Sequence, residues 1–229
     1  MSLWIKICGN TSLGDAQLAV EAGADAVGFV FAPSPRQVTA AEAAAIVRRL
    51  SPQIEKIGVF VDAPLEEIYS TVRASGLTGV QLHFEAPSEL PAKLRQRLGP
   101  SLRILRVVHF EDGAAEQAAK QVAEHSRNPH VDAVLADSRT RASVGGTGVA
   151  FDWLSAARAL RQARALHQDG EERKVVAAGG LNPANVAEAI ATLRPWGVDV
   201  VSGVEEMPGR KDPEKLRAFV ARARAAHRE

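Results

Sequence analysis

Short apolar runs rich in β-branched residues alternate along the chain with longer, alanine-rich segments that have a helical period. A short apolar run bounded by polar residues is typical of a buried strand, and a period of about 3.6 is typical of an amphipathic helix. The pattern predicts eight strands, at Trp4–Cys8, Ala26–Phe31, Lys56–Val61, Gly79–His83, Arg103–Val108, Ala133–Asp137, Lys174–Ala178 and Val198–Ser202. It also predicts eight helices, near Leu13–Ala22, Ala40–Leu50, Leu65–Ala74, Ser88–Leu98, Glu111–His125, Asp152–His167, Pro183–Thr192 and Pro213–His227.

Regular alternation of strand and helix indicates βα units around a parallel sheet. Eight such units in 229 residues match an α/β fold of the (β/α)8 TIM barrel type, which commonly forms one domain. A doubly wound open sheet is the alternative, but it usually has about five or six strands and no closing unit. The pattern therefore predicts a single (β/α)8 barrel over residues 1–229.

Polar residues at the beginnings of strands and helices refine this prediction. Asp25, Asp132 and Asp199 each accompany the start of a predicted strand. We expect all three at the bottom of the barrel, where residues contribute to stability rather than to chemistry. Asn182-Pro183 and Asp212-Pro213 each place a capping side chain before a proline at the expected first position of a helix.

Composition narrows the classes of partner. The chain is 46% hydrophobic and 24% charged, as a globular protein is, and its formal net charge is only +1. So small a net charge does not favour binding to nucleic acid or to an anionic membrane surface. One cysteine and no apolar run of about 20 residues indicate a cytoplasmic protein with no membrane span. The expected partner is a small molecule, and the sequence is compatible with a monomer or a homodimer.

Catalytic groups of such barrels come from the carboxyl ends of strands and from the loops that follow. Cys8 ends the first predicted strand and Asp137 ends the sixth, so their side chains are expected to face each other across the mouth. Two groups placed in this way suit a reaction that takes a proton from carbon and gives one to oxygen. A packed core thiol for Cys8 and a turn cap for Asp137 are the alternatives.

Lys6 has the same strand parity as Cys8 and is expected inside the barrel beneath it. Its ammonium would favour the thiolate form of Cys8. A structural ion pair with one of the aspartates at the strand beginnings is a second interpretation, and the two are compatible.

The turns after strands seven and eight predict a phosphate site. Gly179, Gly180, Ser202 and Gly203 would expose backbone N–H groups there, although glycines also simply form tight turns. Arg36, in the second loop, is positioned to pair with a substrate carboxylate, with a solvated loop charge as the alternative. The run Gly145–Gly148 has the composition of a lid.

Metal and nucleotide signals are weak. One cysteine, six scattered histidines and no Walker or dinucleotide motif predict a protein without metal or cofactor.

Several strings, in order along nearly the whole chain, resemble those of the phosphoribosylanthranilate isomerases of tryptophan biosynthesis. The strings are Lys6–Gly9, Gly23–Phe31, Ser34–Arg36, Gly58–Val61, Val80–His83, Gly145–Gly148, Phe151–Trp153, Gly179–Pro183 and Ser202–Glu205. The resemblance implies a barrel that needs no metal or cofactor and performs an Amadori rearrangement. N-(5-phosphoribosyl)anthranilate becomes 1-(2-carboxyphenylamino)-1-deoxyribulose 5-phosphate.

The same resemblance assigns roles. It implies that Asp137 is the general acid that opens the ribose ring and that Cys8 is the general base at ribose C2. It implies that Arg36 faces the anthranilate carboxylate and that the glycines of strands seven and eight hold the phosphate.

Two other functions stay open. The phosphoribosyl isomerase of histidine biosynthesis uses the same rearrangement, but its family has aspartate at the position of Cys8. A non-catalytic barrel that binds a phosphorylated metabolite would keep the glycines but would not need both Cys8 and Asp137.

Overall fold

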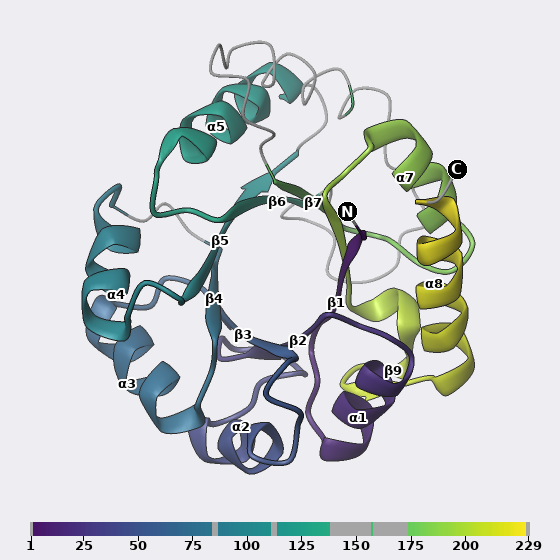
Figure 1. Ribbon diagram of the computed structural model, residues 1–229, viewed down its shortest axis with the longest axis horizontal. Helices are drawn as coiled ribbons and strands as arrows, with labels where there is room; N and C mark the ends of the chain where they lie inside the picture. The colour runs from purple at the N-terminus through teal and green to yellow at the C-terminus, as the bar shows by residue number, and fades with distance from the viewer. Residues whose placement is uncertain (1, 84–86, 111–113, 138–156, 158–173, 228–229) are drawn as a thin grey trace.

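A computed structural model describes residues 2–83, 87–110, 114–137, 157 and 174–227. Eight parallel strands form a closed ring with helices around its outside (Figure 1). The strands are β1 (Trp4–Ile7), β2 (Ala26–Val30), β3 (Glu55–Phe60), β4 (Gly79–Leu82), β5 (Arg103–His109), β6 (Ala133–Asp137), β7 (Val175–Ala178) and β8 (Gly197–Val200). The described α-helices are α1 (Leu13–Glu21), α2 (Ala40–Val47), α3 (Leu65–Ser75), α4 (Leu90–Leu98), α5 (Ala115–Arg127), α7 (Val186–Leu193) and α8 (Pro213–Ala226).

The ring closes because β1 pairs with both β2 and β8. Lys6 has Ala26 as its register partner on one side and Asp199 on the other. The strands follow one another around the ring in chain order, which confirms the predicted (β/α)8 barrel and excludes an open doubly wound sheet. Of the predicted helix at Asp152–His167 the structure describes only Ala157, which is helical and buried, and the run Gly145–Gly148 lies outside the described residues.

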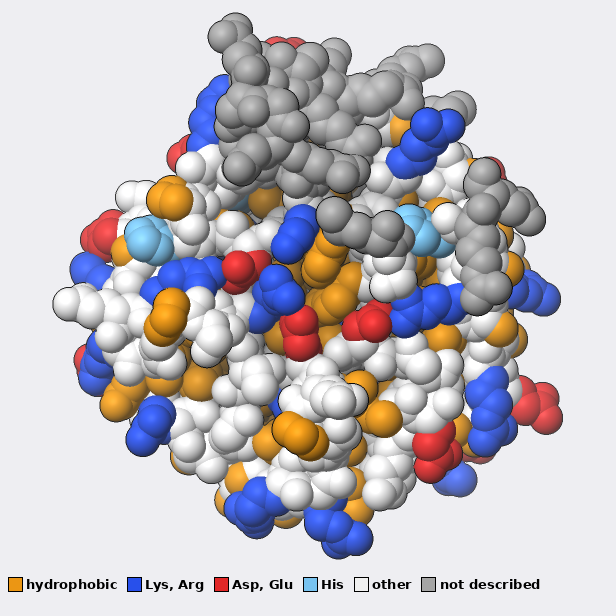
Figure 2. All heavy atoms as spheres, in the orientation of Figure 1, with side chains coloured by type: hydrophobic (Ala, Val, Ile, Leu, Met, Phe, Trp, Pro, Cys, Tyr) orange, Lys and Arg blue, Asp and Glu red, His pale blue; other side chains and the backbone are white. Residues whose placement is uncertain are grey.

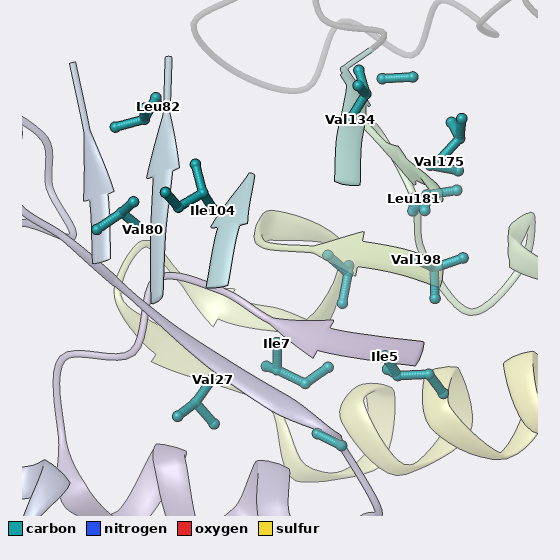
Figure 3. Packing of buried hydrophobic residues seen from close by; sticks show 14 of the residues in the cluster. Ile5, Ile7, Val27, Val80, Leu82, Ile104, Val134, Val175, Leu181 and Val198 are labelled. Carbon is teal, nitrogen blue, oxygen red and sulfur yellow. The ribbon is translucent and has the colours of Figure 1, made fainter. Parts of the chain in front are cut away.

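Successive side chains of each strand point alternately toward the helices and into the barrel. Ile5 and Ile7 of β1 and Val198 of β8 belong to the large apolar cluster between the barrel and the helices (Figure 3). Trp4 belongs instead to a second cluster in the barrel interior. The same alternation directs Lys6 and Cys8 inward, which places polar groups inside the barrel above an apolar floor.

Ion pairs hold the amino ends of several strands. Asp25 lies 2.8 Å from Arg224 of α8, and Asp132 lies 2.6 Å from Arg95 of α4. Each of these carboxylates also accepts a backbone N–H of the adjacent strand. The expected structural role of Asp25 and Asp132 is thus confirmed. In the view down the barrel, acidic and basic side chains adjoin around an apolar centre (Figure 2).

The prediction for Asp199 is wrong. β8 begins at Gly197, so Asp199 lies well inside the strand, and its Oδ1 is 2.8 Å from Lys6 Nζ in the barrel interior. Gly197 pairs with Trp4 in the sheet, and a Cβ on it would lie 2.7 Å from the Trp4 carbonyl oxygen. Only glycine allows this approach, and the strand therefore starts earlier than its apolar residues suggest.

Of the two helices predicted to begin at a proline, one begins where the sequence predicts and the other begins later. Asp212 accepts two backbone N–H bonds of the first turn of α8, as the Asp212-Pro213 pair predicts. The helix predicted to begin at Pro183 begins at Val186 instead, because Asn182 caps the preceding turn by accepting two backbone N–H bonds there. No helix within the described ranges has the length and apolar composition needed to cross a membrane.

A small antiparallel hairpin follows the barrel. It consists of β9 (Glu205–Met207) and β10 (Arg210–Lys211), lies between β8 and α8, and is preceded by the 3-10 turn η1 (Ser202–Val204). No apolar run marks this hairpin in the sequence, because its strands are three and two residues long. It was not predicted.

Candidate active site

A pocket of about 170 Å³ opens at the carboxyl ends of the barrel strands. Six of the seven residues predicted to act on or bind the substrate line this pocket: Cys8, Arg36, Asp137, Gly179, Gly180 and Ser202. The seventh, Gly203, follows Ser202 directly but is not among the described residues that line it. Because barrel enzymes carry their chemistry at this end, the pocket is the candidate active site.

Cys8 follows β1 directly and is almost fully buried, with 3% of its surface exposed. Its N–H donates to the carbonyl oxygen of Val200 over 2.9 Å, which continues the pairing of β1 with β8 up to the pocket. The adjacent strand has Gly28 at this level, so the thiol lies against backbone rather than against a side chain. The sulfur atom is thereby held at the wall of the pocket.

A buried ion pair lies beneath the thiol. Burial alone would lower the pKa of Lys6, but the Asp199 carboxylate and then Cys8 raise it above its ordinary value. Burial raises the pKa of Cys8, with Lys6 acting in the opposite direction and Asp199 in the same one. Lys6 thus points inward as predicted and pairs with an aspartate, but its expected effect on the thiolate is outweighed by burial.

Asp137 is the last residue of β6 and is also buried, with 3% of its surface exposed. Its carbonyl oxygen accepts the N–H of Phe110 over 2.8 Å, and its register partner on β5 is His109. β7 and β8 separate β6 from β1 in the ring. The carboxyl group and the Cys8 thiol therefore reach one pocket from strands that do not pair with each other.

Arg36 is not a solvated loop charge. Its Nε donates to both carboxylate oxygens of Glu205, over 2.9 and 3.1 Å, and its Nη2 donates to Glu205 Oε2 over 2.6 Å. Burial alone would raise the pKa of Glu205, but its bonds with Arg36 and Lys211 hold it below its ordinary value. The guanidinium is therefore fixed at the pocket by an ionised partner.

The glycines after β7 form a turn that exposes the backbone to the pocket. Gly179 and Gly180 both have positive φ, 84° and 62°, a conformation that directs successive backbone groups to one side of the chain and favours anions. Gly203 serves a different purpose, since a Cβ on it would overlap the carbonyl oxygen of Leu181. The absence of a side chain there lets the turns after β7 and β8 pack together.

Other residues of the pocket were not predicted. Val59 and Val61 give it an apolar wall at the end of β3, while Gln81 and Asp199 add polar groups. Gln81 Nε2 lies 2.6 Å from Nε2 of His83. A sequence signal exists for Gln81 and Asp199, because each is a polar residue within an otherwise apolar strand. No three His, Cys, Asp or Glu side chains in the described part of the chain lie together as metal ligands.

The ring of eight parallel strands, with a thiol, a carboxyl group and a glycine turn at one pocket, defines a (β/α)8-barrel enzyme. Residues 5–222 match the profile of the family described as N-(5'-phosphoribosyl)anthranilate (PRA) isomerase. The chain is 44% identical over 221 residues to the PRA isomerase of Citrifermentans bemidjiense, with 96% of each protein covered. It is 42% identical over 226 residues to that of Myxococcus xanthus, with 98% of each covered.

Two solved structures agree with these sequences. PRA isomerase from Thermotoga maritima has a TM-score of 0.83 and 35% identity, over 97% of this chain and 99% of that one. A PRA isomerase in complex with reduced 1-(o-carboxyphenylamino)-1-deoxyribulose 5-phosphate has a TM-score of 0.80 and 34% identity, with the same coverage of 97% and 99%. The chain belongs to the PRA isomerase family.

Proposed function

We propose that this isomerase converts N-(5-phosphoribosyl)anthranilate to 1-(2-carboxyphenylamino)-1-deoxyribulose 5-phosphate in tryptophan biosynthesis, with Cys8 as general base and Asp137 as general acid. Membership of the family supports the reaction. The observation that carries the two roles is a buried thiol and a carboxyl group on the wall of one pocket, from strands that do not pair. General acid–base chemistry needs groups on two sides of the substrate.

The first step opens the ribose ring. Asp137 gives its proton to the ring oxygen while the bond between that oxygen and C1 breaks. The lone pair of the anthranilate nitrogen forms a double bond to C1, which gives a protonated Schiff base. The Asp137 carboxylate that results faces this positive charge.

The second step moves the hydrogen at C2. The Cys8 thiolate takes the C2 proton, and the electrons of the C–H bond form a double bond between C1 and C2. The iminium nitrogen becomes neutral, which gives an enolamine. The enolamine then tautomerises to the C2 ketone: C1 takes a proton back from the Cys8 thiol, and the C2 hydroxyl gives its proton to the Asp137 carboxylate, so both groups return to their starting forms. C1 is reduced and C2 is oxidised within one molecule, so the atoms and electrons balance without a co-reactant.

Substrate binding follows from the remaining groups. The turns that contain Gly179, Gly180, Ser202 and Gly203 would bind the phosphate through backbone N–H groups. Arg36 would bind the anthranilate carboxylate through the edge of its guanidinium that Glu205 leaves unused. The apolar wall of Val59 and Val61 suits the aromatic ring.

The proposed setting is the cytoplasm, with residues 1–229 acting as one catalytic domain. The buried free thiol of Cys8 suits a reducing compartment. A PRA isomerase from Thermotoga maritima is described as dimeric, so a homodimer as well as a monomer is consistent with the family.

A direct assay tests the function. The purified chain is incubated separately with N-(5-phosphoribosyl)anthranilate, made in situ, and with the doubly phosphorylated sugar of histidine biosynthesis. We expect turnover of the first compound, followed as loss of its anthranilate fluorescence, and little turnover of the second. Preference for the second compound would indicate the histidine-pathway reaction, and binding without turnover would indicate a non-catalytic barrel.

A further inference from the structure

The β9–β10 hairpin carries two charged side chains that are hidden from solvent. The Glu205 side chain is 3% exposed and that of Lys211 is 0% exposed, whereas the neighbouring Glu206 is 57% exposed. Buried charges are costly unless they are paired and hydrogen-bonded. A short surface hairpin has no need of them for its own stability, so their partners indicate their purpose.

Glu205 pairs with one edge of the Arg36 guanidinium. The edge used consists of Nε and Nη2, which donate to the carboxylate over 2.6 to 3.1 Å. A guanidinium has five N–H groups in one plane, and its Nη1–Nη2 end can bind a second carboxylate in the same way. Arg36 lines the pocket and its Nε–Nη2 edge is taken by Glu205, so the Nη1–Nη2 end would be the one to bind a ligand.

The stem of Arg36 crosses the end of β1. A Cβ on Gly9 would lie 2.8 Å from Arg36 Cδ, so the absence of a side chain at Gly9 leaves room for the arginine. With the stem held by Gly9 and the Nε edge held by Glu205, few rotamers of Arg36 remain. Binding a carboxylate then requires little further ordering of this long side chain.

Lys211 connects the Glu205 carboxylate to the end of β1. Its Nζ donates to Glu205 Oε1 over 3.1 Å, to the carbonyl oxygen of Cys8 over 2.6 Å and to that of Val201 over 3.3 Å. These three bonds use all three N–H donors of the ammonium group. Lys211 therefore ties the hairpin to the ends of β1 and β8.

We propose that Glu205 is a positioning residue that orients Arg36 and thereby sets the specificity for an aromatic amine that carries a carboxylate, with Lys211 as its anchor. This inference rests on the proposed contact between Arg36 and the anthranilate carboxylate. It gives the hairpin a part in selecting the substrate, although the hairpin lies outside the barrel ring.

The test compares two stable ligands on several variants. One ligand is reduced 1-(o-carboxyphenylamino)-1-deoxyribulose 5-phosphate, and the other is its counterpart made from aniline, which lacks the carboxyl group. We expect Glu205→Gln to weaken binding of the first ligand about tenfold or more, because the amide presents N–H groups to the guanidinium. Binding of the second ligand is expected to stay within about twofold. Steady-state kinetics should show KM rising more than kcat falls.

Matched variants separate positioning from folding. Glu206→Gln removes an exposed carboxylate from the same hairpin and is expected to change neither affinity. Glu205→Asp keeps the buried charge, but its shorter side chain cannot reach both nitrogen atoms of Arg36. It should therefore also weaken binding of the carboxylated ligand and not of the aniline counterpart, by a smaller factor than Glu205→Gln. If Glu205→Gln does not fold, Glu205→Asp decides the question alone.

The outcomes distinguish this inference from the proposed function. Equal weakening of both ligands by the Glu205 variants overturns the inference, since a general structural role would act on both. If Arg36→Ala weakens only the carboxylated ligand while both Glu205 variants bind it normally, the Arg36 contact stands and the role of Glu205 is overturned. If Arg36→Ala has no effect, the carboxylate contact itself is overturned, and the inference with it.

Discussion

A Cβ atom on Gly28 would lie 2.5 Å from Sγ of Cys8, so the thiol occupies the space that any other residue at position 28 would fill. The same Cβ would lie 3.1 Å from Cα of Cys8, which belongs to the strand and cannot move independently. The side chain of Cys8 would therefore have to turn away.

Gly28→Ala is expected to lower kcat by about 10- to 100-fold while leaving the barrel folded, because a displacement of about 1 Å at a reacting group is costly. Gly14→Ala is the matched control, since the nearest atom to its Cβ would be 4.0 Å away. Steady-state rates and thermal melting of both variants check this. Normal turnover in Gly28→Ala would show that the thiol need not stay in its present position.

Removing either proposed proton-transfer group should abolish most of the turnover. We expect Cys8→Ala and Asp137→Asn each to reduce kcat by about 10²- to 10⁴-fold or more, because general acid–base catalysis contributes about this much. Circular dichroism should show folded variants. Near-normal turnover of either variant in the fluorescence assay would refute the role assigned to that residue.

Arg36 is expected to affect binding more than turnover. Arg36→Ala should raise KM about tenfold or more, because a charged hydrogen-bonding partner of the substrate is lost. Arg36→Lys retains a cation beside Glu205 but lacks a second planar edge, so KM should still rise. An unchanged KM in both variants counts against the carboxylate contact.

The reactivity of Cys8 should depend on pH in a defined direction. Burial raises the pKa of its thiol, so the thiolate is scarce near neutrality and grows with pH. Because the chain has one cysteine, alkylation by iodoacetamide reports on it alone. The alkylation rate is expected to keep rising beyond about pH 8.5, which is the ordinary pKa of a cysteine thiol. A plateau of the rate below that pH would contradict the expectation.

Glu205 should stabilise the fold in a way that acid removes. Its pKa is lower in the folded protein than its ordinary value, so its contribution is fully present above the pKa of the unfolded group, about 4.3. The contribution is lost as pH falls through the lower, folded value. Urea unfolding between about pH 7 and pH 3 should therefore show a weaker acid dependence in Glu205→Gln, and equal slopes would oppose this assignment.

The fold could be predicted from the sequence because strands and helices repeat their apolar residues with different periods along the chain. Ile5 and Ile7 point to the helices and Trp4 points into the barrel, so both faces of β1 carry apolar residues and the strand appears as one run that only the inward Lys6 interrupts. The start of β8 was missed, because Gly197 joins the strand through close packing on Trp4, which no local pattern records.

The site could be predicted in part for a similar reason. Cys8, Asp137 and the glycine turn lie at strand ends, which the apolar runs locate. The parts of Glu205 and Lys211 could not be predicted, since both are defined by contacts with distant residues. Glu205 meets Arg36 across 169 positions of sequence, and only the closed barrel brings the two together.

The bond from Lys211 to the carbonyl oxygen of Cys8 joins residues 203 positions apart. The backbone around the sulfur is thus secured only once the segment that carries Lys211 has docked on the end of β1. Contacts that close so large a loop form late, because the loop entropy must be overcome first. Undocking of that segment would leave Cys8 on its strand but remove the hydrogen bond that fixes its carbonyl group, so the hairpin couples long-range folding to the geometry of the pocket.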